Sequence, residues 1–340
     1  MQDGMAVWLP YHQEEIRGLP DALSYGHWDG SAALPGDPGE VRFLVGPPVP
    51  GAEHALGRVL PRMRRLEVVQ LLSSGYDYMK PLLDLMPPGT TLATARGVHG
   101  EATAELAVTL LLALSRGIDQ FVHRQGARQW LPEYRSTLIG KRVMVVGHGA
   151  VGTAVAERLS AFRCETVVVA RTGRTAPTGL VHGITDLPKL LPTVDAVVLC
   201  APLTEHTRGM FGADTLGLLK DGALVVNVAR GELLDTGAVV NELRQGRLRI
   251  ALDVMDPEPL PAGHPLWDLP GVLITPHVAA FTDAFPRMSM NFLRRQLQRY
   301  VRGDDLHNVV HTVQGSREPR RRAGERAGGE VLSGMPATRL

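Results

Sequence analysis

The segment VMVVGHGAVG holds the clearest chemical motif in the chain: Gly147, Gly149 and Gly152 stand in G-x-G-x-x-G spacing between an apolar run and an amphipathic helical pattern. The first glycine allows a tight turn, the second lets a pyrophosphate approach the backbone, and the third lets the helix pack on the strand. Backbone amides at the helix start, including those of Ala150 and Val151, would then face the phosphates. The motif in this context predicts a dinucleotide-binding site.

The end of the next apolar run bears on which dinucleotide is bound. An acidic residue about 20 positions after the motif would bind the ribose hydroxyls of NAD, but this chain has Ala170 and Arg171 there, followed by Thr172. A guanidinium binds a 2′-phosphate through paired hydrogen bonds, whereas an acid would repel it. Arg174 offers a second guanidinium. The sequence therefore favours NADP(H), and NAD(H) stays open if Arg171 is only a solvated loop residue.

Regular alternation of strands and helices surrounds this motif. The apolar runs are continuous rather than alternating, which indicates burial on both faces and hence a parallel sheet covered by helices. The expected strands are 142–147, 166–170, 195–202, 223–229, 249–254 and 271–277, with helices after the glycine motif, near 213–219 and at 235–245.

The rest of the chain supplies a second body. Strands are expected at 41–46 and 66–72, with a helix over 52–65 between them, and the apolar pattern of 101–116 predicts a buried helix. A further helix follows His277 and leads to 306–310.

Composition narrows the class of protein. The 340 residues are 44% hydrophobic and 21% charged with a net charge of +1, so neither disorder nor electrostatic binding of nucleic acid is indicated. Two cysteines exclude a disulfide framework, and no zinc-ligand spacing occurs, so no metal is expected.

The longest apolar stretch, 106–114, is too short for a membrane span, which needs about 20 residues. The N-terminus has no signal-peptide pattern. A cytoplasmic protein is expected, with a basic tail whose six arginines and three glutamates follow residue 313.

Several separated motifs together resemble the D-isomer-specific 2-hydroxyacid dehydrogenase family, particularly its glyoxylate/hydroxypyruvate reductase branch. The resemblance implies an α/β fold of two Rossmann-like domains, each a doubly wound parallel sheet. The nucleotide-binding domain, 98–277, would be inserted into a discontinuous substrate domain, 1–97 and 278–313, that closes over the substrate. The composition of 314–340 predicts a disordered basic tail. It covers roughly 40–310 and rests on SSGYD (73–77), TAELAVTLLLAL (103–114), GHGAVG (147–152), APLTEHTRG (201–209), VNVARGELLD (226–235), ALDVMDPEPLP (251–261) and TPHVAAFT (275–282).

By this resemblance the catalytic residues are Arg230, Glu258 and His277. Each lies at or beyond the carboxyl end of an expected parallel strand, which is the edge where open α/β sheets bind ligands. Hydride transfer to a ketone leaves negative charge on oxygen, so the site needs a cation and a proton donor. Arg230 would hold the substrate carboxylate, His277 would donate the proton, and Glu258 would orient the imidazole and favour its protonated form.

The resemblance also implies binding residues outside this trio. Backbone amides of Ser74 and Gly75 would bind the substrate carboxylate. Further cofactor contacts are implied for Pro202, Thr207, Val228, Ala229 and Asp253, the last through the nicotinamide carboxamide.

The implied activity is reduction of a small 2-oxo acid to the D-2-hydroxy acid with a nicotinamide cofactor. Formate dehydrogenases of the family place Gln where Glu258 stands, which disfavours formate, but no residue excludes phosphite as substrate. A dinucleotide-sensing corepressor of the same fold is the alternative from another class. Trp130 resembles a residue in a segment that crosses to the partner subunit in relatives, so a homodimer is expected.

Overall fold

The computed structural model describes residues 5–49, 51–177 and 179–315 and divides the chain into two compact units. Unit 1 consists of the described parts of Met1–Ala95 and Arg287–Leu340, and unit 2 is the continuous segment Arg96–Pro286 between them. One unit is thus inserted into the other. The contact boundaries fall at 95/96 and 286/287, whereas the sequence predicted 97/98 and 277/278, so the first boundary differs by two positions and the second by nine. From residue 316 onward, the expected basic tail lies outside the described residues.

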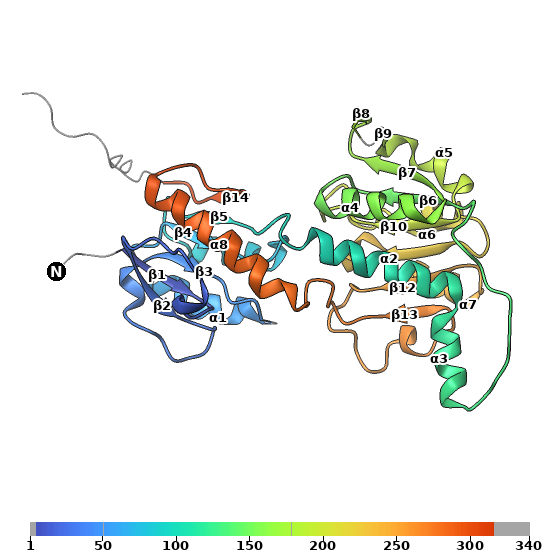
Figure 1. Cartoon of the computed structure of the whole chain (residues 1–340), viewed down its shortest axis with the longest axis horizontal. Helices are drawn as coiled ribbons and strands as arrows, with labels where there is room; N and C mark the ends of the chain where they lie inside the picture. The colour runs from blue at the N-terminus through green and yellow to red at the C-terminus, as the bar shows by residue number, and fades with distance from the viewer. Residues whose placement is uncertain (1–4, 50, 178, 316–340) are drawn as a thin grey trace, which may run out of the picture. The chain divides into compact units, whose positions relative to one another are not determined.

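Unit 1 is built on a six-stranded sheet in the order β14-β5-β4-β3-β1-β2, parallel except for β14 (Figure 1). Helix α1 (Ala52–Val59) packs with the tryptophans Trp8 and Trp28 into its core. The strands are β1 (Met5–Leu9), β2 (Leu23–His27), β3 (Val41–Val45), β4 (Val68–Gln70), β5 (Thr91–Ala93) and β14 (Val309–Thr312). The expected strands at 41–46 and 66–72 correspond to β3 and β4, whereas β1, β2 and β5 were not anticipated.

Unit 2 contains an eight-stranded sheet in the order β13-β12-β11-β10-β6-β7-β9-β8. All neighbours are parallel except the β8–β9 pair. The strands are β6 (Arg142–Val146), β7 (Glu165–Ala170), β8 (Arg174–Ala176), β9 (Gly179–Gly183), β10 (Ala196–Leu199), β11 (Leu224–Asn227), β12 (Arg249–Leu252) and β13 (Val272–Ile274). The predicted doubly wound sheet is confirmed, and only the β8–β9 hairpin departs from the expected pattern.

Both faces of this sheet are covered, as the continuous apolar runs predict. Along β6, Val143 and Val145 join one buried cluster with α2 (Gly100–Arg116) and α4 (Ala150–Leu159). Met144 and Val146 join a second cluster on the opposite face. The helices of that second face are α5 (Leu187–Leu190), α6 (Ala213–Gly217) and α7 (Thr236–Arg244). Successive strand residues point to opposite faces, so each face needs its own apolar set.

Two further helices complete the described chain. Helix α3 (Ile118–Gly126) follows α2 after a bend of 66° at Gly117. Helix α8 (Ala284–Arg302) leads into unit 1, where its Gln296 amide donates a hydrogen bond to the Gln70 side chain at 2.7 Å. No single helix among the described residues is long and apolar enough to span a membrane; only the bent pair of α2 and α3 reaches that length and composition.

Candidate active site

Three neighbouring strands of unit 2 deliver the residues expected to do chemistry. Strands β11, β12 and β13 are adjacent and parallel, so their carboxyl ends lie at one edge of the sheet. Arg230 follows β11, Glu258 follows β12 and His277 follows β13. The predicted catalytic residues therefore all lie in unit 2, in loops that leave the same edge.

The side chains of His277 and Glu258 meet in an ion pair. Nδ1 of His277 lies 2.5 Å from Oε1 of Glu258, although 19 positions separate the two residues. Both side chains are partly exposed, 49% for the histidine and 38% for the glutamate. Because the carboxylate occupies Nδ1, Nε2 is the nitrogen presented to a substrate. A carboxylate in this position fixes the orientation of the ring and stabilises an imidazolium.

The buried carboxylate of Asp253 organises the loop that carries His277. It is fully buried; Oδ1 accepts hydrogen bonds from Thr275 Oγ1 at 2.6 Å and from the Val278 amide at 3.0 Å, and Oδ2 accepts one from the Ala279 amide at 3.2 Å. The His277 amide donates to the Asp253 carbonyl at 2.8 Å. These bonds hold His277 at φ 53°, a conformation that is uncommon outside glycine and needs support from the surrounding structure. Asp253 is thus a positioning residue for the imidazole.

Arg230 is positioned by a second buried polar residue at a strand end. Asn227, fully buried, accepts the Ala229 amide at 3.0 Å and donates to the Arg230 carbonyl at 2.8 Å. The Arg230 guanidinium donates from Nη1 to the Ala229 carbonyl at 2.6 Å. The turn after β11 is therefore fixed on both sides of the arginine.

Gly231 lets the Arg230 turn lie against the chain that leads to Glu258. A Cβ at Gly231 would come within 2.0 Å of the Met255 carbonyl carbon and 2.5 Å of the Asp256 amide nitrogen. We therefore expect Gly231→Ala to force the two loops apart and to lower the free energy of unfolding by about 2 to 3 kcal/mol, as overpacking typically does. Urea unfolding followed by circular dichroism measures this change.

Gly217→Ala is the matched control for Gly231→Ala. A Cβ at Gly217, the last residue of α6, meets no atom of the described chain within 4 Å. Alanine there should leave the stability unchanged or raise it slightly, because a helical glycine costs more backbone entropy than alanine. Equal unfolding midpoints for the two variants would refute the steric role of Gly231.

The glycine motif has the shape that a dinucleotide needs. Gly147 has φ 116°, and a Cβ there would lie 2.7 Å from the Cys200 carbonyl carbon. A Cβ on Gly152 would lie 1.8 Å from the Gly147 carbonyl oxygen, so helix α4 packs directly on the turn. At Gly149, the residue before α4, a Cβ would meet no atom of the described residues within 4 Å. The second glycine thus leaves open space beside the amides of Ala150 and Val151, which fits a pyrophosphate.

Basic side chains gather beside this motif. Arg171 is exposed directly after β7, and Arg174 begins β8. Nη2 of Arg174 lies 2.8 Å from Nδ1 of His148, the residue between the first two motif glycines. The Gly147 amide donates to the Val169 carbonyl at 2.7 Å, which holds the turn against the end of β7. Arg174 therefore contacts the turn, and Arg171 directly follows the strand against which the turn is held.

The other expected cofactor residues also lie at the carboxyl edge of the unit 2 sheet. The Thr207 hydroxyl donates to the Pro202 carbonyl at 2.7 Å and accepts the Thr204 amide at 2.8 Å, which closes the loop after β10. Val228 and Ala229 follow β11 and are buried. Contact of these residues, of Thr172 and of Asp253 with a cofactor stays a prediction.

The expected substrate loop after β4 belongs to unit 1. The Ser73 hydroxyl donates to the Gly75 carbonyl at 2.8 Å, so the turn through Ser74 is closed by its own residues. Binding of a carboxylate by the Ser74 and Gly75 amides stays a prediction.

Sequence reasoning missed the positioning roles of Asn227, Gly231 and Thr275, and it assigned Asp253 only to the cofactor. A usable signal existed for two of them. Asn227 ends the apolar strand β11, and Asp253 directly follows the apolar strand β12. A polar side chain in that position is buried and must find hydrogen-bond partners nearby.

Comparison with known proteins places these features in a family. The family model described as "D-isomer specific 2-hydroxyacid dehydrogenase, NAD binding domain" matches residues 108–279. A glyoxylate reductase of Thermofilum pendens is 31% identical over 72% of this chain and 75% of its own length. The chloroplastic/mitochondrial formate dehydrogenase of Arabidopsis thaliana is 30% identical over 81% and 73%. Among solved structures, the chain is similar to a D-isomer specific 2-hydroxyacid dehydrogenase from Xanthobacter autotrophicus Py2 in complex with NADPH and MES. The two superpose with a TM-score of 0.74 at 29% sequence identity, over 91% of this chain and 98% of that one.

Proposed function

Because this chain belongs to the D-isomer specific 2-hydroxyacid dehydrogenase family, we propose that it reduces a small 2-oxo acid, such as glyoxylate or hydroxypyruvate, to the D-2-hydroxy acid with NADPH. The observation that carries this proposal is the His277–Glu258 ion pair. It supplies an oriented proton donor at the same sheet edge as Arg230 and the glycine motif. A carbonyl reduction needs such a donor, a cation for the substrate and a dinucleotide site.

The proposed reaction divides between the cofactor and the chain. When bound, the nicotinamide would supply the hydride for the new C–H bond at the substrate carbonyl carbon. Arg230 binds the substrate carboxylate through its planar fork of N–H donors and polarises the adjacent carbonyl. Nε2 of His277 donates a proton to the oxygen as the C=O double bond becomes a single bond. Glu258 retains its hydrogen bond to Nδ1 throughout and holds the ring in place.

The amides of Ser74 and Gly75 complete the proposed set of substrate-binding residues. Glycine allows the close approach of a carboxylate to the backbone. The Pro202–Thr207 loop and the buried pair Val228 and Ala229 are proposed to contact the cofactor, together with Thr172 and Asp253.

Glu258 favours a 2-oxo acid over formate. Formate gives up a hydride and becomes CO₂, so its oxidation requires no proton donor or acceptor. The formate enzymes that this chain resembles have Gln at the position of Glu258. The intact ion pair of Glu258 with His277 suits a site that donates a proton. In a protein that only senses dinucleotides, the same pair would be retained without a reaction to support, so its presence favours the enzyme.

The basic residues beside the glycine motif support the preference for NADPH. Arg171 and Arg174 are exposed, and Arg174 contacts His148 of the motif turn. A 2′-phosphate carries up to two negative charges and is bound by guanidinium groups.

Arg171→Asp is expected to reverse the cofactor preference. The substitution removes a cation and adds an anion beside the 2′-phosphate, so KM for NADPH should rise by about 10- to 100-fold, as expected for a lost charge-assisted hydrogen bond of about 1.5 to 3 kcal/mol. KM for NADH should change little. Arg163→Asp, a surface variant of the same charge change, is the control. An unchanged ratio of the two KM values would remove Arg171 from the phosphate site.

Initial rates with a panel of 2-oxo acids test the proposed activity. Glyoxylate, hydroxypyruvate, pyruvate and a bulky 2-oxo acid should each be measured with NADPH and NADH, with formate and phosphite tested in the oxidative direction. We expect the highest kcat/KM for a two- or three-carbon 2-oxo acid with NADPH. Absence of turnover with every 2-oxo acid would overturn the proposal. Cofactor binding without turnover would favour the alternative, a dinucleotide-sensing corepressor of the same fold.

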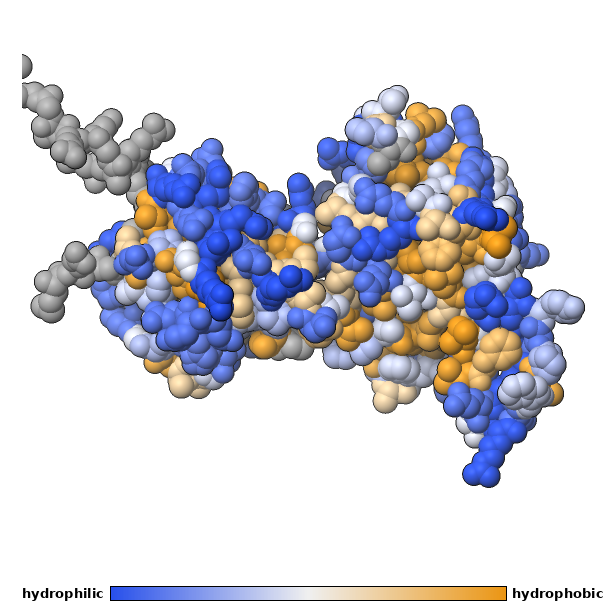
Figure 2. Space-filling model, in the orientation of Figure 1, coloured by the Kyte–Doolittle hydropathy of each residue, from blue (hydrophilic) through white to orange (hydrophobic). Residues whose placement is uncertain are grey.

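We also propose that the protein is a cytoplasmic homodimer. Hydrophobic residues are exposed on α3 and in the segment after it (Figure 2). Trp130 is 95% exposed, and Val122 and Leu131 are more than half exposed. An apolar surface of this kind is typical of a face that a second subunit covers.

A further inference from the structure

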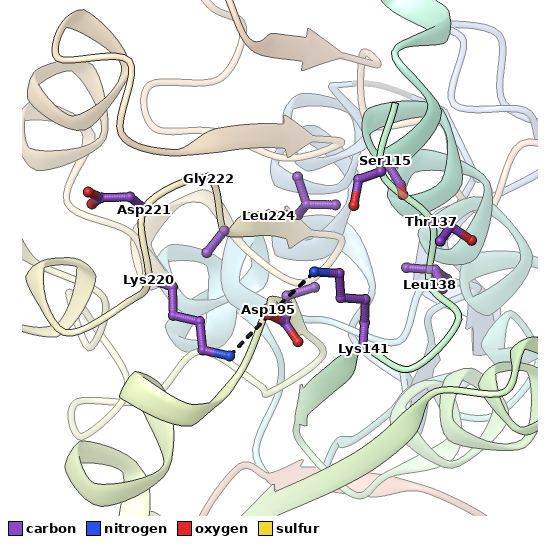
Figure 3. A pocket seen from close by; sticks show the side chains of 12 residues that line it. Ser115, Thr137, Leu138, Lys141, Asp195, Lys220, Asp221, Gly222 and Leu224 are labelled. Atoms are coloured by element: carbon purple, nitrogen blue, oxygen red, sulfur yellow. Dashed lines mark hydrogen bonds and ion pairs between the residues drawn. The ribbon is translucent and has the colours of Figure 1, made fainter. Parts of the chain in front are cut away.

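A small cavity lies at the edge of the unit 2 sheet opposite the glycine motif (Figure 3). Lys141 and Asp195 directly precede β6 and β10, and Gly222 and Ala223 precede β11. The cavity measures about 80 Å³. It is therefore formed at the amino-terminal ends of parallel strands, whereas the proposed active site lies at their carboxyl ends.

Two lysines flank one carboxylate in this cavity. Lys220 Nζ donates to Asp195 Oδ1 at 3.0 Å, and Lys141 Nζ lies 3.8 Å from the same oxygen. Asp195 Oδ2 accepts the Arg142 amide at 2.8 Å. Burial raises the pKa of Asp195, but these hydrogen bonds and the lysine charges outweigh it and hold the pKa below its usual value. The carboxylate is thus ionised near neutral pH, and the group carries one net positive charge.

The second acid of the cavity wall does not cancel this charge. The side chain of Asp221 is 86% exposed, and its carboxylate lies 3.5 Å from Nη1 of Arg247. Figure 3 shows it pointing away from Lys141 and Lys220. The excess positive charge is therefore confined to the two ammonium groups. Lys141 Nζ, at 3.8 Å, lies beyond hydrogen-bonding distance of Asp195, and Lys220 Nζ uses only one of its three N–H donors there, so both ammonium groups keep donors for a ligand.

An unpartnered hydroxyl lies in the same wall. Ser115 is 1% exposed, lines the cavity, and its Oγ has no hydrogen-bond partner among the described residues. Leaving such a group unsatisfied costs about 1 to 3 kcal/mol, so a buried hydroxyl without a partner indicates a missing ligand or water. Thr137 also lines the cavity.

The distribution of lysines points to this place as well. The chain has only four lysines against 32 arginines, yet two of the four flank the same carboxylate. The ammonium group is a compact charge with three donors on a flexible stem, and it suits a small ligand that a rigid guanidinium fork would not fit.

From these features we infer that the cavity is a second ligand site, which binds a small oxyanion such as a short-chain carboxylate or inorganic phosphate. The anion would neutralise the excess charge of Lys141 and Lys220 and accept a hydrogen bond from Ser115. A volume of about 80 Å³ holds more than one water but is far below the several hundred Å³ of a cofactor site. The buried side chain of Leu138 and that of Leu224 add an apolar wall, which suits a carboxylate with a short hydrocarbon chain.

Acylation of the four lysines tests this inference in the full-length protein. The protein in HEPES buffer is treated with an N-hydroxysuccinimide acetate at constant ionic strength in chloride, propionate or inorganic phosphate, and each lysine is followed by mass spectrometry. Propionate or phosphate should slow acetylation of Lys141 and Lys220 severalfold relative to chloride. Lys80 and Lys189, which are exposed and outside the cavity, should react equally in all three. Equal reactivity of Lys141 and Lys220 in the three salts would overturn the inference.

Two variants separate ligand binding from a structural role. Ser115→Ala removes a hydroxyl that has no partner, so the melting temperature should stay the same or rise while the concentration of propionate needed for protection rises severalfold. Lys141→Met should weaken the protection of Lys220, and Lys189→Met, with the same change of charge, should not. Unaltered protection in both Ser115→Ala and Lys141→Met would show that the cavity does not bind the anion.

Discussion

Replacing His277 by alanine should lower kcat for reduction of the best 2-oxo acid by about 10²- to 10⁴-fold, the contribution typical of a positioned general acid. The substituted chain loses the Nε2 proton donor, while the glycine motif and the arginines beside it stay unchanged. The Kd for NADPH should therefore stay within a factor of about two to three, as expected for a substitution that does not touch the bound group. Stopped-flow measurement of NADPH oxidation and fluorescence titration of the cofactor follow the two quantities separately.

A histidine outside the site provides the control for His277→Ala. His54→Ala is the matched control, because the His54 side chain is 80% exposed and belongs to unit 1. Retention of full activity by His277→Ala would exclude His277 as the proton donor and strengthen the sensor alternative.

Replacing Arg230 by alanine should lower kcat/KM for the 2-oxo acid by at least about 10²- to 10³-fold, because the site loses a preorganised charge at the substrate carboxylate and carbonyl. Arg230→Lys retains the charge but loses the planar fork, so it should recover only part of the activity, mainly through a lower KM than that of the alanine variant. Steady-state kinetics over a range of substrate concentrations separate KM from kcat.

Arg244→Ala is the control for the arginine variants. Arg244 is exposed at the end of α7 and belongs to the same unit, so its loss should leave kcat/KM unchanged. If Arg230→Ala and Arg244→Ala had the same kinetics, Arg230 would have no part in binding or polarising the substrate.

Most of unit 2 could be predicted from the sequence because its strands are short and continuously apolar. Strands β6, β10, β11, β12 and β13 lie within the runs expected for them, and β7 begins one residue before its run. Burial on two faces imposes that pattern locally, so it can be read without knowing the neighbours. The glycine motif is equally local, because the turn, the open position and the helix contact involve residues a few positions apart.

Unit 1 was harder to predict at its edge. Strand β2 reads LSYGH, mixes polar and apolar residues, and pairs on one side only, at the end of its sheet. The β8–β9 hairpin of unit 2 also lies at a sheet edge, and half of its strand residues are exposed. Edge strands are less buried, so their apolar pattern is weak.

The sequence by itself determined the two kinds of element, the parallel character of the unit 2 sheet, the glycine motif and the three side chains proposed for catalysis, because each leaves a pattern within a short stretch. Tertiary structure alone decided which of these side chains meet. The contact of His277 with Glu258, the support of both loops by Asp253 and Gly231, and the joining of Lys141 with Lys220 at Asp195 all link separate strands. Such contacts depend on strand order and on the paths of the loops, and these are set by packing across the whole sheet.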